Sequence, residues 1–136
     1  MSVWIPAELR RIVIARAGGK CEYCLRHESD SALPHQPDHI ASRRHGGETT
    51  AENLALACWV CNLLKGPEVA GIDPITGVAA KLFHPRLDRW SDHFRLDRGL
   101  IIGLTPEGRT TAEVLQFNRD DLVEMRLVLI TQRRYP

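Results

Sequence analysis

Two closely spaced pairs of cysteines constrain this chain more than any other feature of its sequence. The 136 residues contain four cysteines, arranged as two C-x-x-C motifs with residues 25–57 between them: Cys21 and Cys24, then Cys58 and Cys61. Zinc prefers four tetrahedral ligands, and two such turns supply four thiolates. We therefore predict a structural zinc site. The alternatives are a redox motif, which would leave one pair without a role, and four ordinary buried cysteines.

Length and charge limit the remaining possibilities. A chain of this length suffices for one domain with a modest core. Lysine and arginine number 18 against 17 acidic residues, so the net charge is only +1. Any phosphate-binding surface must then be a local patch, which weakens the case for a protein that only binds DNA. The sequence has neither a membrane-length apolar run nor the features of a signal peptide, and we expect a cytoplasmic protein without a membrane partner.

The first half predicts two helices that flank short strands. Residues 6–17 have helical apolar spacing, with Pro6 in the first turn and two glycines at the end. Residues 27–37 are polar and indicate a loop, residues 38–40 a strand end, and residues 43–47 an exposed turn. A second helix is expected from the second C-x-x-C motif to Lys65, where Gly66 and Pro67 stop it.

The second half is expected to be richer in strands. Short apolar stretches near residues 78–83, 92–96, 100–105 and 109–117 predict β-hairpins, with a turn at residues 106–108. Asn118 is predicted to cap a final helix whose apolar face is formed by Leu122, Met125, Val128 and Leu129. We expect one domain over residues 1–136, with a core at 21–66 and a β-rich extension at 67–136 that ends in a helix.

The segment between and around the second cysteine pair carries a recognisable series of short motifs. These are Asp38-His39-Ile40, Gly46-Gly47, Asn53-Leu54 and the run CWVCNLLKG from residue 58. Their order resembles the HNH endonuclease family, with asparagine at the third position of the hallmark, the HNN variant. The resemblance implies an α+β fold class: a ββα-metal finger with a four-cysteine zinc site, followed by a C-terminal extension of β-hairpins and a helix.

The chemistry of these residues agrees with that resemblance. Hydrolysis of a phosphodiester bond needs a base, and the imidazole of His39 accepts a proton near neutral pH. It also needs charge neutralisation at the leaving oxygen, which Mg²⁺, Mn²⁺ or another divalent ion provides when oxygen atoms hold it. Asp38 and Asn62 supply such oxygens. By resemblance, Asn53 is the asparagine that braces the loop around the base. We predict a metal-dependent endonuclease that acts on DNA.

Three basic residues are candidates for contacts with nucleic acid. Lys65 shares a helix face with Asn62, and Arg43 and Arg44 lie in the predicted exposed turn. Each has a simpler interpretation as a solvated surface residue. Neighbours in a regular strand also point to opposite faces, so Asp38 and His39 share one site only where the strand ends or bends. The alternative function is a zinc-stabilised nucleic-acid-binding or interaction module without cleavage activity.

Overall fold

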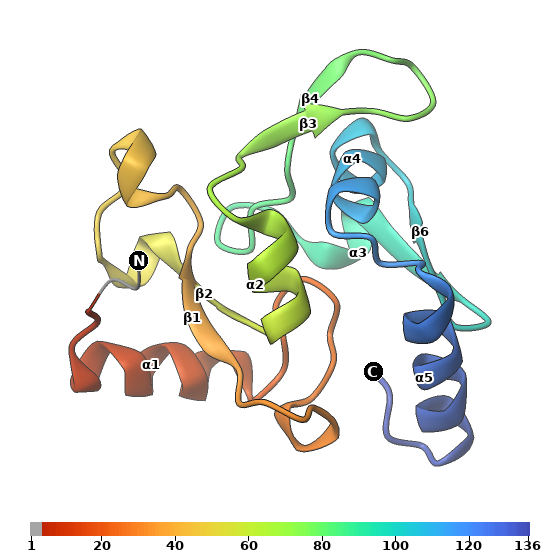
Figure 1. The fold of residues 1–136 in the computed structure, drawn as a ribbon, viewed down its shortest axis with the longest axis horizontal. Coiled ribbons are helices and arrows are strands. Elements are labelled where there is room, and N and C mark those ends of the chain that lie inside the picture. The colour runs from red at the N-terminus through yellow and green to blue at the C-terminus, as the bar shows by residue number, and fades with distance from the viewer. Residues whose placement is uncertain (1–3) are drawn as a thin grey trace.

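A β-hairpin followed directly by a helix forms the centre of the first half (Figure 1). The computed structural model describes residues 4–136. Helix α1 (Ala7–Ala17) is followed by strand β1 (Gln36–His39), strand β2 (Leu54–Ala57) and helix α2 (Trp59–Lys65). Strands β1 and β2 pair antiparallel, from Gln36 opposite Ala57 to His39 opposite Leu54. The two helices predicted for the first half are confirmed, each starting one residue later than expected.

Helix α1 is fixed to the outer side of this hairpin. Apolar side chains of the helix and of β2 form a separate small core, made of Ile5, Val13, Leu54 and Leu56. Arg16 adds hydrogen bonds from its guanidinium to the carbonyl oxygens of Ala51 and Leu54, at 2.9 and 2.6 Å. Because both apolar packing and hydrogen bonds hold it, α1 has a defined place beside β1 and β2.

The extension contains two further hairpins and three helices. Strands β3 (Ala70–Ile72) and β4 (Ala79–Lys81) form one antiparallel pair, and β5 (Phe94–Asp97) and β6 (Leu100–Gly103) form another. The helices are α3 (Trp90–His93), α4 (Pro106–Val114) and α5 (Asp120–Thr131). The extension therefore has more helix than strand, and the expectation of a β-rich segment is wrong in this respect.

Helix α4 replaces the strand that was predicted at residues 109–117. Thr105 caps it by accepting a hydrogen bond from the Gly108 amide at 3.0 Å, and Pro106 occupies its first turn. Proline at that position is typical of a helix start, so the apparent turn at residues 106–108 is the beginning of a helix. Thr110 and Thr111 are β-branched and favour strands, but both are fully buried within the helix.

Asn118 does not cap α5, contrary to the prediction. Arg119 holds the cap position, and the Asn118 amide instead pairs with both backbone groups of Ile101. Leu129 of the predicted apolar face is buried, but Val128 is 54% exposed. The other buried residue on α5 is Arg126, whose guanidinium donates to the backbone carbonyls of Gly99 and Phe117 and to the Asn118 side chain.

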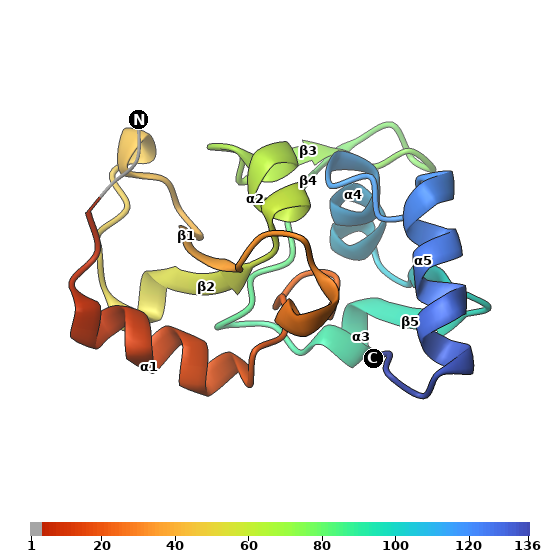
Figure 2. The ribbon, with the colours of Figure 1, turned by 60° about the horizontal axis from the view of Figure 1, so that its bottom comes forward.

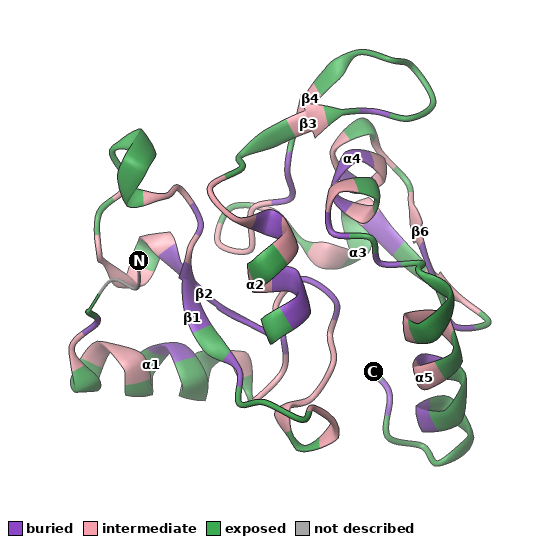
Figure 3. Cartoon of the chain, viewed as in Figure 1, coloured by how far each residue is buried: buried purple, intermediate pink, exposed green. Residues whose placement is uncertain are grey.

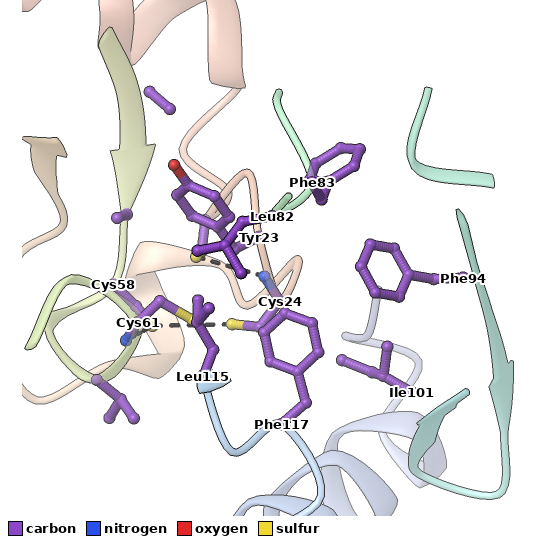
Figure 4. Close-up of a cluster of buried hydrophobic side chains, with 14 of the residues drawn as sticks. Tyr23, Cys24, Cys58, Cys61, Leu82, Phe83, Phe94, Ile101, Leu115 and Phe117 are labelled. Atoms are coloured by element: carbon purple, nitrogen blue, oxygen red, sulfur yellow. Dashed lines mark hydrogen bonds between the residues drawn. The ribbon is translucent and has the colours of Figure 1, made fainter. Parts of the chain in front are cut away.

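One apolar core joins the two halves of the chain (Figures 2 and 3). Figure 4 shows its centre, where the cysteines meet residues of the extension: Leu82, Phe83, Phe94, Ile101, Leu115 and Phe117. Trp90 also donates a hydrogen bond from its indole nitrogen to the carbonyl of Tyr23 at 2.8 Å. The extension thus completes the core around the first half. Within residues 4–136, no helix has the length and apolar character to span a bilayer.

Candidate active site and metal centre

The four cysteines come together in the shared core. Their sulfur atoms all lie within 4.8 Å of one another, and those of Cys24 and Cys58 are 3.7 Å apart. A tetrahedral site with Zn–S bonds of about 2.3 Å requires sulfur atoms separated by about 3.8 Å. The cluster therefore fits a structural metal ion such as zinc, and the prediction that the two cysteine pairs come together as one potential metal site is confirmed.

Local backbone geometry places each pair of sulfur atoms. The Cys24 amide points at the sulfur of Cys21, at 3.5 Å, and the Cys61 amide at that of Cys58, at 3.4 Å. Cys58 also occupies the N-cap position of α2, so the start of the helix fixes the second turn. Burial raises the pKa of the Cys21 thiol well above its ordinary value. A bound cation compensates for this cost by stabilising the thiolates.

A cleft of about 840 Å³ opens beside strand β1. Its lining combines three of the predicted catalytic residues with two of the predicted nucleic-acid contacts: Asp38, His39, Asn62, Arg43 and Arg44. They come from β1, from α2 and from the short 3₁₀ turn η2 (Arg43–His45) between the strands. Volumes of 300–1,000 Å³ are typical of ligand sites, so the cleft is large enough for part of a substrate.

Asp38 lies on the buried face of β1 with one carboxylate oxygen engaged. Its Oδ2 accepts a hydrogen bond from the Tyr23 hydroxyl at 3.4 Å and lies 3.1 Å from Nζ of Lys65. Within residues 4–136, Oδ1 has no such partner, and it is not sealed from solvent. Burial raises the pKa of Asp38, and the Lys65 ammonium partly offsets this shift. One oxygen therefore stays available for a cation.

His39 borders the same cleft from the last position of β1. Its Nε2 lies 2.9 Å from the Thr49 hydroxyl. Burial lowers the pKa of His39, and the positive charges of Arg43 and Lys65 lower it further. Both effects favour the neutral imidazole, which is the form that a base requires. His39 is the last residue of β1, and it lines the cleft together with its neighbour Asp38 although a regular strand directs neighbours to opposite faces.

The loop after β1 is held by Asn53. Its side-chain oxygen accepts from the Ala41 amide at 2.9 Å, and its nitrogen donates to the carbonyls of Ala41 and Glu48, at 2.9 and 2.8 Å. Gly47 packs closely against the Ala41 backbone, because a Cβ at this position would be 1.8 Å from the Ala41 carbonyl oxygen. The Gly-Gly turn therefore reflects close backbone approach at Gly47 as well as chain reversal.

Comparison with known protein families agrees with this geometry. Residues 21–68 match the model of the HNH endonuclease family. This segment therefore has the sequence pattern of an HNH domain. The matched segment includes both cysteine pairs and each predicted catalytic residue, which confirms the resemblance described above. No match was found among the curated proteins or among the solved structures. An HNH domain indicates an enzyme of the nuclease type with a nucleic-acid substrate.

Lys65 of the HNH domain has an unexpected position. Its side chain is only 2% exposed, and Nζ lies 3.0 Å from the backbone oxygen of His39 as well as 3.1 Å from Asp38. The interpretation of Lys65 as a solvated lysine at a helix end is wrong. Its ammonium contacts the backbone and a carboxylate of β1, and Lys65 is not among the residues that line the cleft.

The other two basic candidates and Asn62 have the expected accessibility. Arg43 and Arg44 are exposed, and Arg43 approaches the Thr49 hydroxyl at 3.3 Å. Asn62 is half-buried, and within the described chain its side-chain amide has no hydrogen bond. Sequence reasoning missed Arg10 and Gln36, which also line the cleft. No local motif marks either residue, because their place in the cleft depends on how α1 packs against β1.

Proposed function

We propose that this protein is a metal-dependent endonuclease that hydrolyses phosphodiester bonds of DNA. The observation that carries the proposal is the joint placement of Asp38, His39 and Asn62 on one cleft, beside two exposed arginines. A module that only bound nucleic acid would need basic residues there. It would have no need for an imidazole beside Asp38 Oδ1 and the Asn62 amide oxygen, neither of which has a hydrogen-bond partner among residues 4–136.

Each residue has a distinct role in the proposed reaction. His39 accepts the proton of the attacking water, and Thr49 keeps the imidazole oriented through Nε2. Asp38 through its free Oδ1 and Asn62 through its amide oxygen would hold a divalent ion such as Mg²⁺ or Mn²⁺. When bound, that ion supplies positive charge next to the leaving oxygen. Asn53 fixes the loop that carries Thr49 and η2.

Zinc is the metal that we propose for the four cysteines. The all-sulfur donor set and the enclosed position match a structural site, since catalytic zinc sites keep one position open. The two sites therefore differ in donor chemistry: sulfur in the core and oxygen in the cleft. In this proposal the cysteine site stabilises the fold and takes no part in hydrolysis.

Cleavage of supercoiled plasmid DNA tests the proposal directly. The purified protein is incubated with the plasmid in Mg²⁺, Mn²⁺ or Ni²⁺, and nicked and linear products are measured over time. We expect His39→Ala to reduce the rate by about 10²–10⁴-fold, the usual contribution of a positioned base, without a change in thermal unfolding. His45→Ala is the matched control, since His45 is an exposed histidine of η2 outside the cleft lining.

Two results would contradict the proposal. Equal cleavage by the wild type and His39→Ala would remove His39 as the base. No cleavage with any of the metals would contradict the endonuclease function and favour a binding module, for which a salt-dependent gel shift is the next measurement. A labelled RNA of the same sequence, run in parallel, tests the choice of DNA as the substrate.

A further inference from the structure

The cleft has a wall that lies outside the segment matched to the HNH family. Ile5 and Arg10 line it together with Gln36 of β1. Arg10 belongs to α1, which precedes residues 21–68. In Figure 1, α1 lies below β1, whereas the loop that carries η2 projects above it. The cleft is therefore lined by residues of α1 and of η2 as well as by residues of β1.

The position of Arg10 on this wall is well defined. Its Nη1 donates a hydrogen bond to Oε1 of Gln36 at 2.8 Å. Gln36 is two residues before Asp38 on β1, so their side chains lie on the same face of the strand. The helix itself is anchored by Val13 in the small core it shares with β2. The guanidinium is thus held along the strand that carries the candidate catalytic residues.

The charge of Arg10 has no acidic partner. Gln36 is neutral, and Arg10 forms no ion pair within residues 4–136. Arg43 and Arg44, which also line the cleft, likewise lack ion pairs in the described chain. The one carboxylate among the lining residues, Asp38, is paired with Lys65. The cleft therefore concentrates positive charge in a chain whose net charge is only +1.

We propose that Arg10 binds the phosphate backbone of the nucleic-acid substrate on the α1 side of the cleft. This inference rests on the proposed function and extends its binding site beyond the HNH domain. A guanidinium matches the geometry of a phosphate group through two parallel N–H donors. With Arg43 and Arg44 reaching the cleft from η2, Arg10 extends the phosphate contacts along the strand to both sides of His39.

Binding measurements with matched arginine variants test this assignment. Fluorescence anisotropy of a labelled DNA duplex is recorded at several salt concentrations, with His39→Ala present in every protein so that the duplex stays intact. Arg10→Gln removes the charge and keeps a side chain able to hydrogen bond with Gln36. Arg10→Lys retains the charge. Arg11→Gln is the control, because Arg11 is the exposed neighbour on the same helix and does not line the cleft.

We expect Arg10→Gln to weaken binding by about 5- to 10-fold and to reduce the slope of log K against log salt by about 1. Arg10→Lys should recover most of the slope, and Arg11→Gln should bind as the parent does. A purely structural role for Arg10 would lower thermal stability without changing the salt slope. Equal slopes for Arg10→Gln and Arg11→Gln would overturn the assignment.

The same experiment separates this inference from the proposed function. If the wild type cleaves DNA and Arg10→Gln retains the slope of Arg11→Gln, the endonuclease function stands and Arg10 is not a phosphate contact. If the wild type neither binds nor cleaves nucleic acid, both proposals fail. Should Arg10→Gln unfold, Arg10→Met and Arg11→Met repeat the comparison, since each removes one charge and keeps a long side chain, and only the former lies in the cleft.

Discussion

The cysteine cluster and the cleft come from the same short stretch of chain but differ in almost every physical property. The cysteines are buried, and side chains from both halves of the protein enclose them. The cleft is lined mostly by exposed and half-buried residues, and its arginines have no acidic partners among the described residues. A structural metal is retained because packing seals it, whereas a catalytic ion must remain accessible to substrate. Because the two regions differ in this way, we expect mutations in the cleft to lower activity without lowering the stability of the fold.

The largest effect is expected at the cysteine cluster. Cys58→Ser removes one of four ligands and also alters the N-cap of α2. Structural zinc contributes on the order of 10 kcal/mol in small zinc domains, which is comparable with the whole stability of a typical domain. We expect loss of bound metal and of cooperative unfolding, measured by metal analysis and circular dichroism. A variant that folds normally without metal would show that the core alone holds this region.

The second effect is expected in the cleft and should leave the fold intact. Asn62→Ala removes an oxygen donor from a half-buried side chain that has no hydrogen bond in the described chain. Mutation of a residue that only hydrogen bonds to a metal ligand typically lowers metal affinity or activity by about 10- to 100-fold. Loss of a ligand itself should cost more, so we expect the cleavage rate to fall by at least about 100-fold. Plasmid cleavage as a function of Mn²⁺ concentration checks this.

The control for Asn62→Ala is Leu63→Ala, at the next position of α2, where the side chain is 70% exposed. The control should cleave as the wild type does, and both variants should unfold at the wild-type temperature. A large loss of stability in Asn62→Ala would show that activity in the cleft cannot be removed without also weakening the fold.

The third effect concerns the extension and its attachment to the core. Arg126→Met keeps an apolar stem but leaves the carbonyls of Gly99 and Phe117 without their donor. Unpaired buried acceptors cost about 1–3 kcal/mol each, so we expect a loss of about 3 kcal/mol and a fall in Tm of about 10 °C. Calorimetry measures both. Arg133→Met, at an exposed position, should have no comparable effect.

The smallest effect is expected from the ion pair that joins the β3–β4 hairpin to α4. The Arg109 guanidinium donates to both carboxylate oxygens of Asp73, at 3.0 and 2.7 Å, and holds the pKa of Asp73 well below its usual range. The folded state therefore binds fewer protons here than the unfolded state. The pair stabilises the fold fully above the ordinary aspartate pKa of about 3.9, and this contribution is lost as the pH falls further.

Asp73→Asn should thus lower Tm by a few degrees near pH 7, and the difference from the wild type should shrink below about pH 4. Thermal unfolding across that range measures it. Asp92→Asn is the control, since Asp92 is exposed and has no ion pair within the described chain. A difference that does not depend on pH would mean that the hydrogen bonds of Asp73 matter more than its charge.

The parts of the fold that the sequence predicted are those defined by local patterns. The C-x-x-C spacing, the motif order and the glycines after each helix depend on neighbouring residues, so they are visible in a single chain. The metal-binding cluster and the helices α1 and α2 follow from them. The roles assigned to Asp38, His39 and Asn62 remain predictions, although the structure brings all three to one cleft.

The parts that the sequence did not predict depend on distant contacts. Thr110 and Thr111 look like strand residues, yet Thr111 stabilises α4 by donating to the Glu107 carbonyl and accepting from the Phe83 amide. Lys65 at the end of a helix is normally solvated, but here it meets a carboxylate and a carbonyl from β1. From the sequence, Arg126 looks like a surface residue of an amphipathic helix. Its burial was not predictable, because no local pattern reveals the distant backbone carbonyls that accept its hydrogen bonds.

The two cysteine pairs flank the β1–β2 hairpin in the sequence, and this has a consequence for experiments with chelators. A metal bound to all four sulfur atoms acts as a cross-link that closes a loop of about 30 residues, worth about 3–4 kcal/mol in chain entropy by analogy with a disulfide. That loop contains Asp38, His39 and Asn53. Removing the metal would loosen the loop and abolish cleavage even with the catalytic ion present. Inhibition by a strong chelator therefore identifies neither ion, and only re-addition of each metal separately distinguishes them.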